Sequence, residues 1–251
     1  MPKIFVAWLL AGVLSALSTT GPVLASDTCD AKSKVGDICL CKLSELRPTQ
    51  SAVGMAEIRI RAEKLREDIQ NRSEQDFLNH IRKDNRMEPI VVGPGGFFYL
   101  TDRHHLARAL YDLGETTTYC RVLDNLSDLH PEVFWQHMQD SNEVYLKDTQ
   151  GNVITPRDLP TSIKDLRNDP FRSLAGAVRE SCGFSNDNNG SNGNYLEFKW
   201  ADYLRTHWAL TGIQVDDIDA NFDSATRAAL QLAIQKEAAT LPGYTGRASC
   251  Q

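Results

Sequence analysis

Apolar residues in the first half of the chain recur with two different periods. In residues 55–69 they come every three or four positions, which places them on one face and predicts an amphipathic helix. Ser73 and Asp76 have the spacing of a capping box, so a second helix is expected to run through 77–81.

Shorter apolar runs between these helices have the length of strands. They are rich in β-branched and aromatic residues, which favour extended backbone. A Gly-Pro-Gly-Gly turn at 93–96 connects two of the runs into a hairpin, whereas Leu-Arg-Pro-Thr-Gln at 46–50 has the composition of a turn. Strands are therefore expected at 38–43, 89–92, 97–100 and 116–123.

The strand at 97–100 leads directly into the start of a helix. That helix is expected over 103–113, with Asp102 as its N-cap and Gly114 as its stop. The succession of strand, helices, hairpin, helix and strand predicts a compact α/β unit of the α+β kind over residues 36–125.

Residues 126–251 are expected to form a mainly helical C-terminal lobe packed on that unit. A Ser/Asn/Gly/Asp-rich loop is expected at 185–194 and a small hairpin at 144–155. Helices are expected from Pro131, from Asp169-Pro170 to Cys182, and over 195–210 and 224–240.

The first 25 residues have the form of an export signal. Lys3 precedes an apolar run at 4–17, and Val23-Leu24-Ala25 resembles a cleavage site before Ser26. An uncleaved membrane anchor is the alternative, but the run is short for a span of about 20 residues. We therefore expect residues 1–25 to be removed and the protein to be periplasmic or secreted, with no membrane contact after cleavage.

Six cysteines follow the cleavage point, and an even number in an exported chain predicts disulfides. The sequence leaves the pairing open. Cys39-Leu-Cys41 has no second paired motif beside it, so structural bridges near the two ends of the chain are favoured over zinc. The cysteines are Cys29, Cys39, Cys41, Cys120, Cys182 and Cys250.

The overall charge argues against one class of partner. Of the 251 residues, 27 are Lys or Arg and 33 are Asp or Glu, giving a net charge of −6. An acidic chain lacks the basic surface of a non-specific nucleic-acid binder, although local basic patches remain compatible with this charge.

The segment 99–108 carries the clearest candidate chemistry. Arg103, His104 and His105 fall in the first turn of the expected helix, where unpaired backbone N–H groups attract anions. This arrangement predicts a site for a phosphate or a similar anion, and either imidazole could move a proton near neutral pH. The alternative is an ordinary helix start with two exposed histidines. No metal site is expected, because adjacent helical residues point about 100° apart.

Three runs of residues resemble motifs of the ParB/sulfiredoxin superfamily, and in particular its branch of ParB-like nucleases. They are Leu46-Arg47-Pro48-Thr49-Gln50, Val53-Gly54 and Asp102-Arg103-His104-His105. Two later runs, 169–174 and 197–205, resemble the same branch, so the resemblance spans residues 43–210. It implies a sulfiredoxin-like mixed sheet, with a nucleotide or phosphate bound against the helix that follows the hairpin.

The chain matches the motifs behind the different activities of this superfamily to different degrees. His104 stands where the sulfinic-acid reductases have their nucleophilic Cys, which disfavours reduction. Asp102, His104 and His105 match the Asp-x-His-His pattern of the serine kinases, but Leu106 replaces the Arg that follows. Those kinases also need a carboxylate near the first motif, where this chain has Thr49 and Gln50, so small-molecule kinase activity is less expected.

These observations predict a protein that binds a phosphate-bearing small molecule or nucleic acid fragment, and the resemblance implies that it is a phosphoester hydrolase, a nuclease. The acidic charge and the absence of an acidic metal cluster from the sequence favour binding without turnover. His104 or His105 would act as general acid/base, with Glu57 as a weaker candidate base whose alternative role is a solvent-facing ion pair with Arg61. The competing hypotheses are a phosphate-binding module without turnover and an interaction protein, and no cofactor is identified. The expected ligand-binding residues are Thr49, Gln50, Asp102, Arg103 and Arg108.

Aromatic residues near the end of the resemblance permit two interpretations. Phe198, Trp200, Tyr203 and Trp208 could stack on a base, but aromatics at helical spacing more often form a core. A hydrophobic core is therefore the favoured interpretation.

Overall fold

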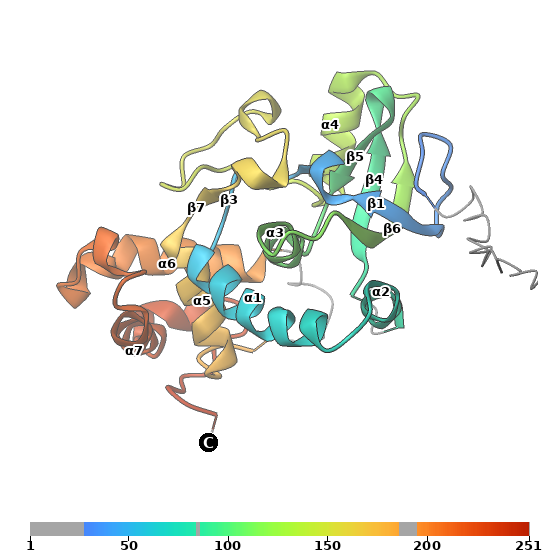
Figure 1. The fold of residues 1–251 in the computed structure, drawn as a ribbon. Coiled ribbons are helices and arrows are strands. Elements are labelled where there is room, and N and C mark those ends of the chain that lie inside the picture. The colour runs from blue at the N-terminus through green and yellow to red at the C-terminus, as the bar shows by residue number, and fades with distance from the viewer. Residues whose placement is uncertain (1–27, 84–85, 186–194, 251) are drawn as a thin grey trace, which may run out of the picture.

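The computed structural model describes residues 28–83, 86–185 and 195–250 (Figure 1). The export signal at 1–25 and most of the loop expected at 185–194 lie outside the described residues. In Figure 1 the sheet and the helices α5, α6 and α7 occupy opposite sides of the molecule, with α1 and α3 between them.

A five-stranded mixed sheet forms the first half, in the order β1-β6-β4-β5-β2. Strands β1 and β6 are antiparallel, β6 and β4 parallel, β4 and β5 antiparallel, and β5 and β2 parallel. The mixed α/β fold class expected from the sequence is confirmed. The strands are β1 (Ile38–Lys42), β2 (Leu46–Pro48), β4 (Glu88–Gly93), β5 (Phe97–Leu100) and β6 (Thr117–Asn125).

Strand β2 corrects one expectation, because its residues were expected to form a turn. Leu46 and Pro48 are buried and pair in parallel with Phe98 and Leu100 of β5. The composition of the segment concealed the strand: Pro lacks a backbone N–H, but an edge strand tolerates it. The chain leaves β2 directly into the loop that carries Thr49 and Gln50.

Three helices pack around this sheet close to their expected positions: α1 (Met55–Gln70), α2 (Glu74–Lys83) and α3 (His104–Asp112). The apolar face of α1 is buried as its periodicity predicts, through Ile58, Ala62 and Leu65. Ser73 accepts a hydrogen bond from the Asp76 N–H at 3.2 Å, which confirms the cap of α2.

The start of α3 differs from the expectation. Its N-cap is Arg103, in the left-handed conformation with a φ of 61°, and not Asp102. The Asp102 carboxylate accepts a hydrogen bond from the Arg103 N–H at 2.7 Å, so it acts one residue before the helix. This N–H is therefore already satisfied. A non-glycine residue held at positive φ costs of order 1 kcal/mol and is often found where a site requires it.

The C-terminal lobe is mainly helical, as expected. Its hairpin at 144–155 is reduced to a bridge between Lys147 and Val153. The helix expected over 224–240 ends at Ala233 and is followed by a 3₁₀ turn at Lys236–Thr240. The helices are α4 (Pro131–Asp140), α5 (Pro170–Glu180), α6 (Leu196–His207) and α7 (Phe222–Ala233).

The two halves of the chain are in close contact along α1 and α5. Strands β3 (Ala52–Val53) and β7 (Arg167–Asn168) pair in parallel just before these helices. A Cβ at Gly54 would lie 2.5 Å from the backbone nitrogen of Ser173, and one at Gly176 would lie 2.9 Å from the Glu57 carboxylate. Gly54 therefore needs glycine for steric reasons, whereas a side chain at Gly176 would have to displace the Glu57 carboxylate, which lies against α5.

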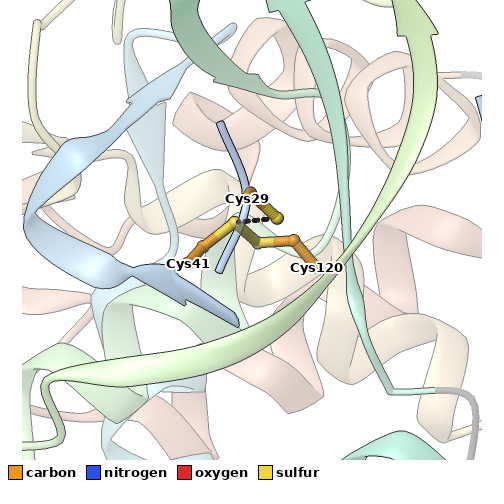
Figure 2. A group of neighbouring side chains, drawn as sticks. All are labelled: Cys29, Cys41 and Cys120. Carbon is orange, nitrogen blue, oxygen red and sulfur yellow. Dashed lines mark hydrogen bonds between the residues drawn. A yellow bond between two sulfur atoms is a disulfide. The ribbon is translucent and has the colours of Figure 1, made fainter. Parts of the chain in front are cut away.

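All six cysteines are paired: Cys29 with Cys39, Cys41 with Cys120, and Cys182 with Cys250. The first two bridges adjoin one another, with the Cys41 and Cys29 sulfurs 3.3 Å apart (Figure 2). The disulfides expected from the even count are present, but only two lie near the ends of the described chain, because Cys41–Cys120 joins β1 to β6 in the middle of the chain. Cys182–Cys250 closes a loop of 68 residues, which stabilises by about 4 kcal/mol in the chain-entropy model.

Within residues 28–83, 86–185 and 195–250, no helix is long and apolar enough to cross a membrane.

Candidate functional site

A cavity of about 490 Å³ lies where α1, α3, α5 and the first turn of α6 converge. Of the eight site residues expected from the sequence, seven line it: Thr49, Gln50, Glu57, Asp102, Arg103, His104 and His105. Arg108 does not line it. Its guanidinium binds Asp112 and the carbonyl groups of Ile163, Lys164 and Leu166, so it fixes a loop.

The imidazole ring of His104 forms hydrogen bonds with backbone groups of two segments. Its Nε2 accepts a hydrogen bond from the Thr49 N–H at 3.1 Å, and the ring also hydrogen-bonds to the backbone of Leu100. Burial, followed by the positive field of His105 and Arg172, lowers the pKa of His104 to about 3. His104 is therefore neutral at physiological pH and ties β2 to the end of β5.

His105, the next residue, makes a similar contact with the backbone N–H of Gly54, further along the same loop. Its Nε2 accepts a hydrogen bond from the Gly54 N–H at 2.9 Å and lies 3.5 Å from Glu57 Oε2. Burial lowers its pKa to about 4, although the Glu57 carboxylate opposes this shift. Both histidines are thus buried and neutral, and each accepts a backbone N–H from the 49–54 loop. The exposed helix start considered in the sequence analysis is not what the structure has.

Glu57 is the carboxylate inside the cavity. Its Oε1 accepts a hydrogen bond from Arg61 at 2.8 Å, whereas Oε2 is buried without a hydrogen-bond partner among the described residues. The pair with Arg61 is the one expected from the sequence, but the Glu57 side chain is only 14% exposed.

Burial alone would raise the pKa of Glu57, but the positive charges around it outweigh burial and lower this pKa below its usual value. His105 contributes to that shift only when protonated. Because the pKa of His105 is about 4, Arg61 and Arg172 are the cations that keep Glu57 ionised at neutral pH. The cavity therefore contains a carboxylate with one uncommitted oxygen.

Arg172 of α5 is a site residue for which the sequence analysis gave no role. It lines the cavity, is 5% exposed, and lies with its guanidinium carbon 3.4 Å from the centroid of the Phe198 ring. Its Nη2 lies 3.5 Å from Glu197, but its Nε and Nη1 have no hydrogen-bond partner among the described residues. Burial lowers its pKa to about 10, so the guanidinium stays charged at neutral pH.

Arg179 and Glu197 extend the charged wall next to Arg172, and they form an ion pair with each other. Arg172 and Arg179 are seven residues apart, which places them on one face of α5. The signal in the sequence was a cation, Arg172, inside the otherwise uncharged and mostly apolar run from Phe171 to Val178. A buried arginine among apolar residues requires partners, and those partners come from other elements.

Aromatic side chains form another part of the cavity wall. Tyr145, Tyr195 and Phe198 are in mutual contact, with ring centroids of Tyr145 and Phe198 3.8 Å apart. The other aromatics of α6 and its C-terminal end, Trp200, Tyr203 and Trp208, are buried in the core of the lobe, as favoured from the sequence.

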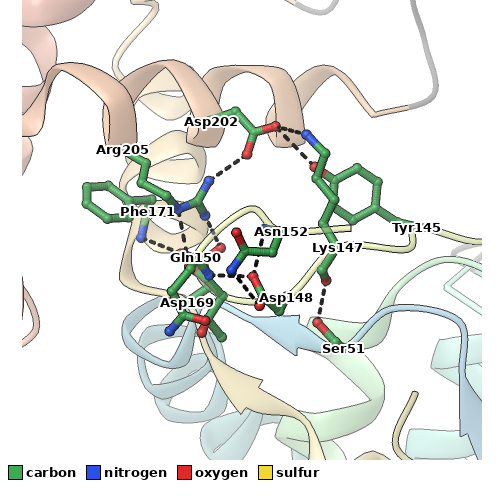
Figure 3. Close-up of polar contacts among 12 residues, drawn as sticks. Ser51, Tyr145, Lys147, Asp148, Gln150, Asn152, Asp169, Phe171, Asp202 and Arg205 are labelled. Carbon is green, nitrogen blue, oxygen red and sulfur yellow. Dashed lines mark hydrogen bonds and ion pairs between the residues drawn. The ribbon is translucent and has the colours of Figure 1, made fainter. Parts of the chain in front are cut away.

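A polar network holds Tyr145 and α5 in place behind this wall (Figure 3). Asp202 binds Lys147 at 2.6 Å and the Tyr145 hydroxyl at 3.3 Å, and Arg205 bridges Asp202 to Asp169. Asp169 is also the N-cap of α5, because its side chain accepts a hydrogen bond from the Phe171 N–H. The position of Arg172, one turn into α5, is thereby fixed relative to α6.

The only group of three or more candidate metal ligands in the described ranges is Cys29, Cys41 and Cys120. All three belong to disulfides, and they lie outside the residues that line the cavity.

The mixed sheet, the helix that follows its hairpin and the cavity at that helix define a ParB-like α/β protein. The family model described as "Putative ParB-like nuclease" matches residues 39–206. The chain therefore belongs to that family.

One solved structure shares the fold of this chain and is also similar to it in sequence. The crystal structure of protein Atu1540 from Agrobacterium tumefaciens is 34% identical, with a TM-score of 0.70, over 84% of this chain and 99% of that one. No curated protein matches the chain.

Proposed function

We propose that the cavity binds a phosphate-bearing ligand and hydrolyses one of its phosphoester bonds. The observation that carries the proposal is Arg172, a buried charged guanidinium in the cavity wall with two nitrogens that lack hydrogen-bond partners among the described residues. Charge-assisted hydrogen bonds from Arg to phosphate oxygens are among the strongest that a protein offers an anion. Arg103, at the mouth of the cavity, adds a second positive charge.

Glu57 is the residue best placed to act as the base. It is ionised at neutral pH, and its Oε2 is uncommitted, so it can take a proton from a water molecule that attacks phosphorus. The new P–O bond forms as the bond to the leaving oxygen breaks, and the leaving oxygen takes a proton from solvent. His105 positions Glu57 and the 49–54 loop, and His104 anchors that loop at Thr49.

Binding of inorganic phosphate tests the role of Arg172. We expect Arg172→Met to weaken phosphate binding by roughly 10–100-fold, the loss typical of one charge-assisted contact. The matched control is Arg227→Met, which removes an exposed arginine from α7. Isothermal titration calorimetry measures both. Equal affinities in the two variants would contradict the proposal.

The alternative function is a phosphate-binding module without turnover. The same cavity supports it, because the two histidines are neutral and occupied by backbone contacts. Release of p-nitrophenol from bis(p-nitrophenyl) phosphate, measured beside phosphate binding, separates the two functions: binding without release supports the module.

We further propose that the protein is exported. Three disulfides in the described chain favour an oxidising compartment, and residues 1–25 have the form of a cleavable signal. Expression with these residues should yield exported protein that begins near Ser26 and whose mass increases by six hydrogens on reduction. Retention of Met1 or six free thiols in the exported protein would contradict export by this route.

A further inference from the structure

The cavity wall contains another partly buried glutamate, Glu143, to which the proposed function gives no role. Its Oε2 is buried and has no hydrogen-bond partner among the described residues. A carboxyl oxygen in this position has lost its hydrogen bonds to water and gained none from the protein. Such groups are uncommon in folded proteins, and catalytic sites are one of the places where they are found.

The end of α4 fixes the backbone of Glu143. Asn142 has a positive φ of 56° and stops the helix, and the Glu143 N–H donates a hydrogen bond to the Met138 carbonyl group at 2.8 Å. The carbonyl group of the next residue, Val144, accepts a hydrogen bond from the Tyr195 hydroxyl at 2.6 Å. Backbone contacts on both sides therefore hold Glu143 in the cavity wall.

Glu143 and Glu57 reach the cavity beside opposite ends of the 49–54 loop. The N–H of Tyr145, two residues after Glu143, donates a hydrogen bond to the carbonyl group of Thr49 at the start of this loop. Glu57 lies three residues after the end of the loop, in the first turn of α1. Because both side chains line the same space, a bound ester can contact the two carboxyl groups at once.

The surroundings of the two carboxyl groups shift their pKa values in opposite directions. Positive charges hold the pKa of Glu57 below its usual value, whereas burial raises the pKa of Glu143. His137 of α4 opposes this increase and Asp124 of β6 adds to it, and these two side chains lie 3.6 Å apart. Tyr195, at the start of α6, also interacts with Glu143 but stays uncharged, because its own pKa is raised to about 12. Two carboxyl groups shifted in this way are suited to act as base and acid.

We propose that Glu143 is the general acid of this cavity and gives its carboxyl proton to the leaving oxygen of the phosphoester. The inference rests on the proposed function and replaces solvent as the source of that proton. A water oxygen bonds to phosphorus as Glu57 takes one of the water protons, and the bond to the leaving oxygen breaks as this oxygen takes the proton of Glu143. Glu57 then releases a proton to solvent and Glu143 regains one, so the reaction consumes one water molecule.

The need for this acid depends on the leaving group. Phenolate is a strong base and leaves readily only when it is protonated, whereas p-nitrophenolate is stable enough to leave without a proton. The contribution of Glu143 should therefore be large for diphenyl phosphate and small for bis(p-nitrophenyl) phosphate. A role in folding or in phosphate binding alone would affect both esters equally.

The test compares Glu143→Gln with the control Glu132→Gln, which changes an exposed carboxylate of α4 outside the cavity. Glutamine keeps the size of the side chain but cannot supply the proton. Initial rates for both esters are measured on one preparation of each variant, so an unfolded fraction lowers both rates alike. We expect Glu143→Gln to slow hydrolysis of diphenyl phosphate by about 10²–10⁴-fold and to leave that of bis(p-nitrophenyl) phosphate nearly unchanged. The control should match the parent for both esters.

The pH dependence gives an independent readout of the same proton. Because the pKa of Glu143 is raised and that of Glu57 is lowered, the rate for diphenyl phosphate should increase as the pH falls below neutral, until Glu57 becomes protonated. The increase should be absent in Glu143→Gln, and it should be absent for bis(p-nitrophenyl) phosphate in the parent.

Equal rate losses for the two esters in Glu143→Gln, or no loss for either, would overturn the inference. A parent that hydrolyses only bis(p-nitrophenyl) phosphate would overturn it as well, because a cavity with a general acid should protonate phenolate. In these cases the proposed hydrolysis still stands if turnover of bis(p-nitrophenyl) phosphate depends on Glu57. If the parent hydrolyses neither ester, the proposed hydrolysis fails, and the role of Glu143 fails with it.

Discussion

We expect Glu57→Gln to lower phosphodiester turnover by about 10²–10⁴-fold, the usual cost of losing a general base. Glutamine keeps the volume of the side chain and an oxygen that can accept the hydrogen bond from Arg61, so the fold should survive the change. It removes the negative charge beside Arg172, and phosphate affinity should therefore stay equal or rise. Initial rates with bis(p-nitrophenyl) phosphate and calorimetry with inorganic phosphate measure the two effects.

The control for this variant is Glu63→Gln, which changes an exposed carboxylate on the same helix. Turnover in the control should equal that of the parent. The pH profile gives a second test: because the pKa of Glu57 is lowered, the rate should be retained as the pH falls below neutral and should decline only where Glu57 becomes protonated. Turnover in Glu57→Gln equal to that of the control would remove Glu57 from the mechanism.

The second large effect is a loss of stability in acid that comes from the two buried histidines. Their pKa values in the folded protein are about 3 and about 4, against about 6.5 in the unfolded chain. Below pH 6.5 the unfolded chain therefore binds protons that the folded protein does not. The free energy of unfolding should fall by about 1.4 kcal/mol per pH unit for each histidine from pH 6 to pH 4.

Glu88 acts in the opposite direction over part of this range. It is fully buried, neither carboxylate oxygen has a hydrogen-bond partner within the described ranges, and burial raises its pKa well above the usual value. It thus binds a proton in the folded protein above pH 4.5, where the unfolded chain does not, and this favours folding at lower pH. The histidine effect is best isolated as a difference between variants.

Urea unfolding of His104→Phe at pH 4, 5, 6 and 7 provides that difference. The variant should be less stable at pH 7, because the Thr49 N–H loses its acceptor, and its stability should depend on pH less steeply by about 1.4 kcal/mol per unit. His130→Gln, which changes an exposed histidine, should keep the slope of the parent. A parent-like slope in His104→Phe would show that His104 titrates normally.

The fold was largely predictable because most of its elements are set by local patterns. The face of α1, the capping residues of α2 and the Gly-Pro-Gly-Gly turn between β4 and β5 each specify a structure within a few residues. Strand β2 was missed because three residues that include Pro48 carry little local signal. Only pairing with β5, some fifty residues later in the chain, makes this segment a strand.

The site was predictable in its location but less so in its chemistry. The Asp-Arg-His-His run lines the cavity, yet the direction in which the two rings point depends on the 49–54 loop, about fifty residues earlier. Arg172 lies in the run 169–174 that resembles the family, but nothing in that run reveals its contacts: Phe198 and Glu197 come from α6, and Glu57 comes from α1. Tertiary contacts of this kind are not visible in a local pattern.

The close approach of Gly54 to Ser173 and of Gly176 to Glu57 also affects how the two halves of such proteins can be exchanged. In a chimera that joins the first half of this chain to the lobe of a relative, any side chain at the position of Gly176 displaces the Glu57 carboxylate. The recipient half must likewise keep a glycine opposite Ser173. We therefore expect chimeras between relatives to fold best where the glycine opposite Ser173 is retained and the residue opposite Glu57 stays small.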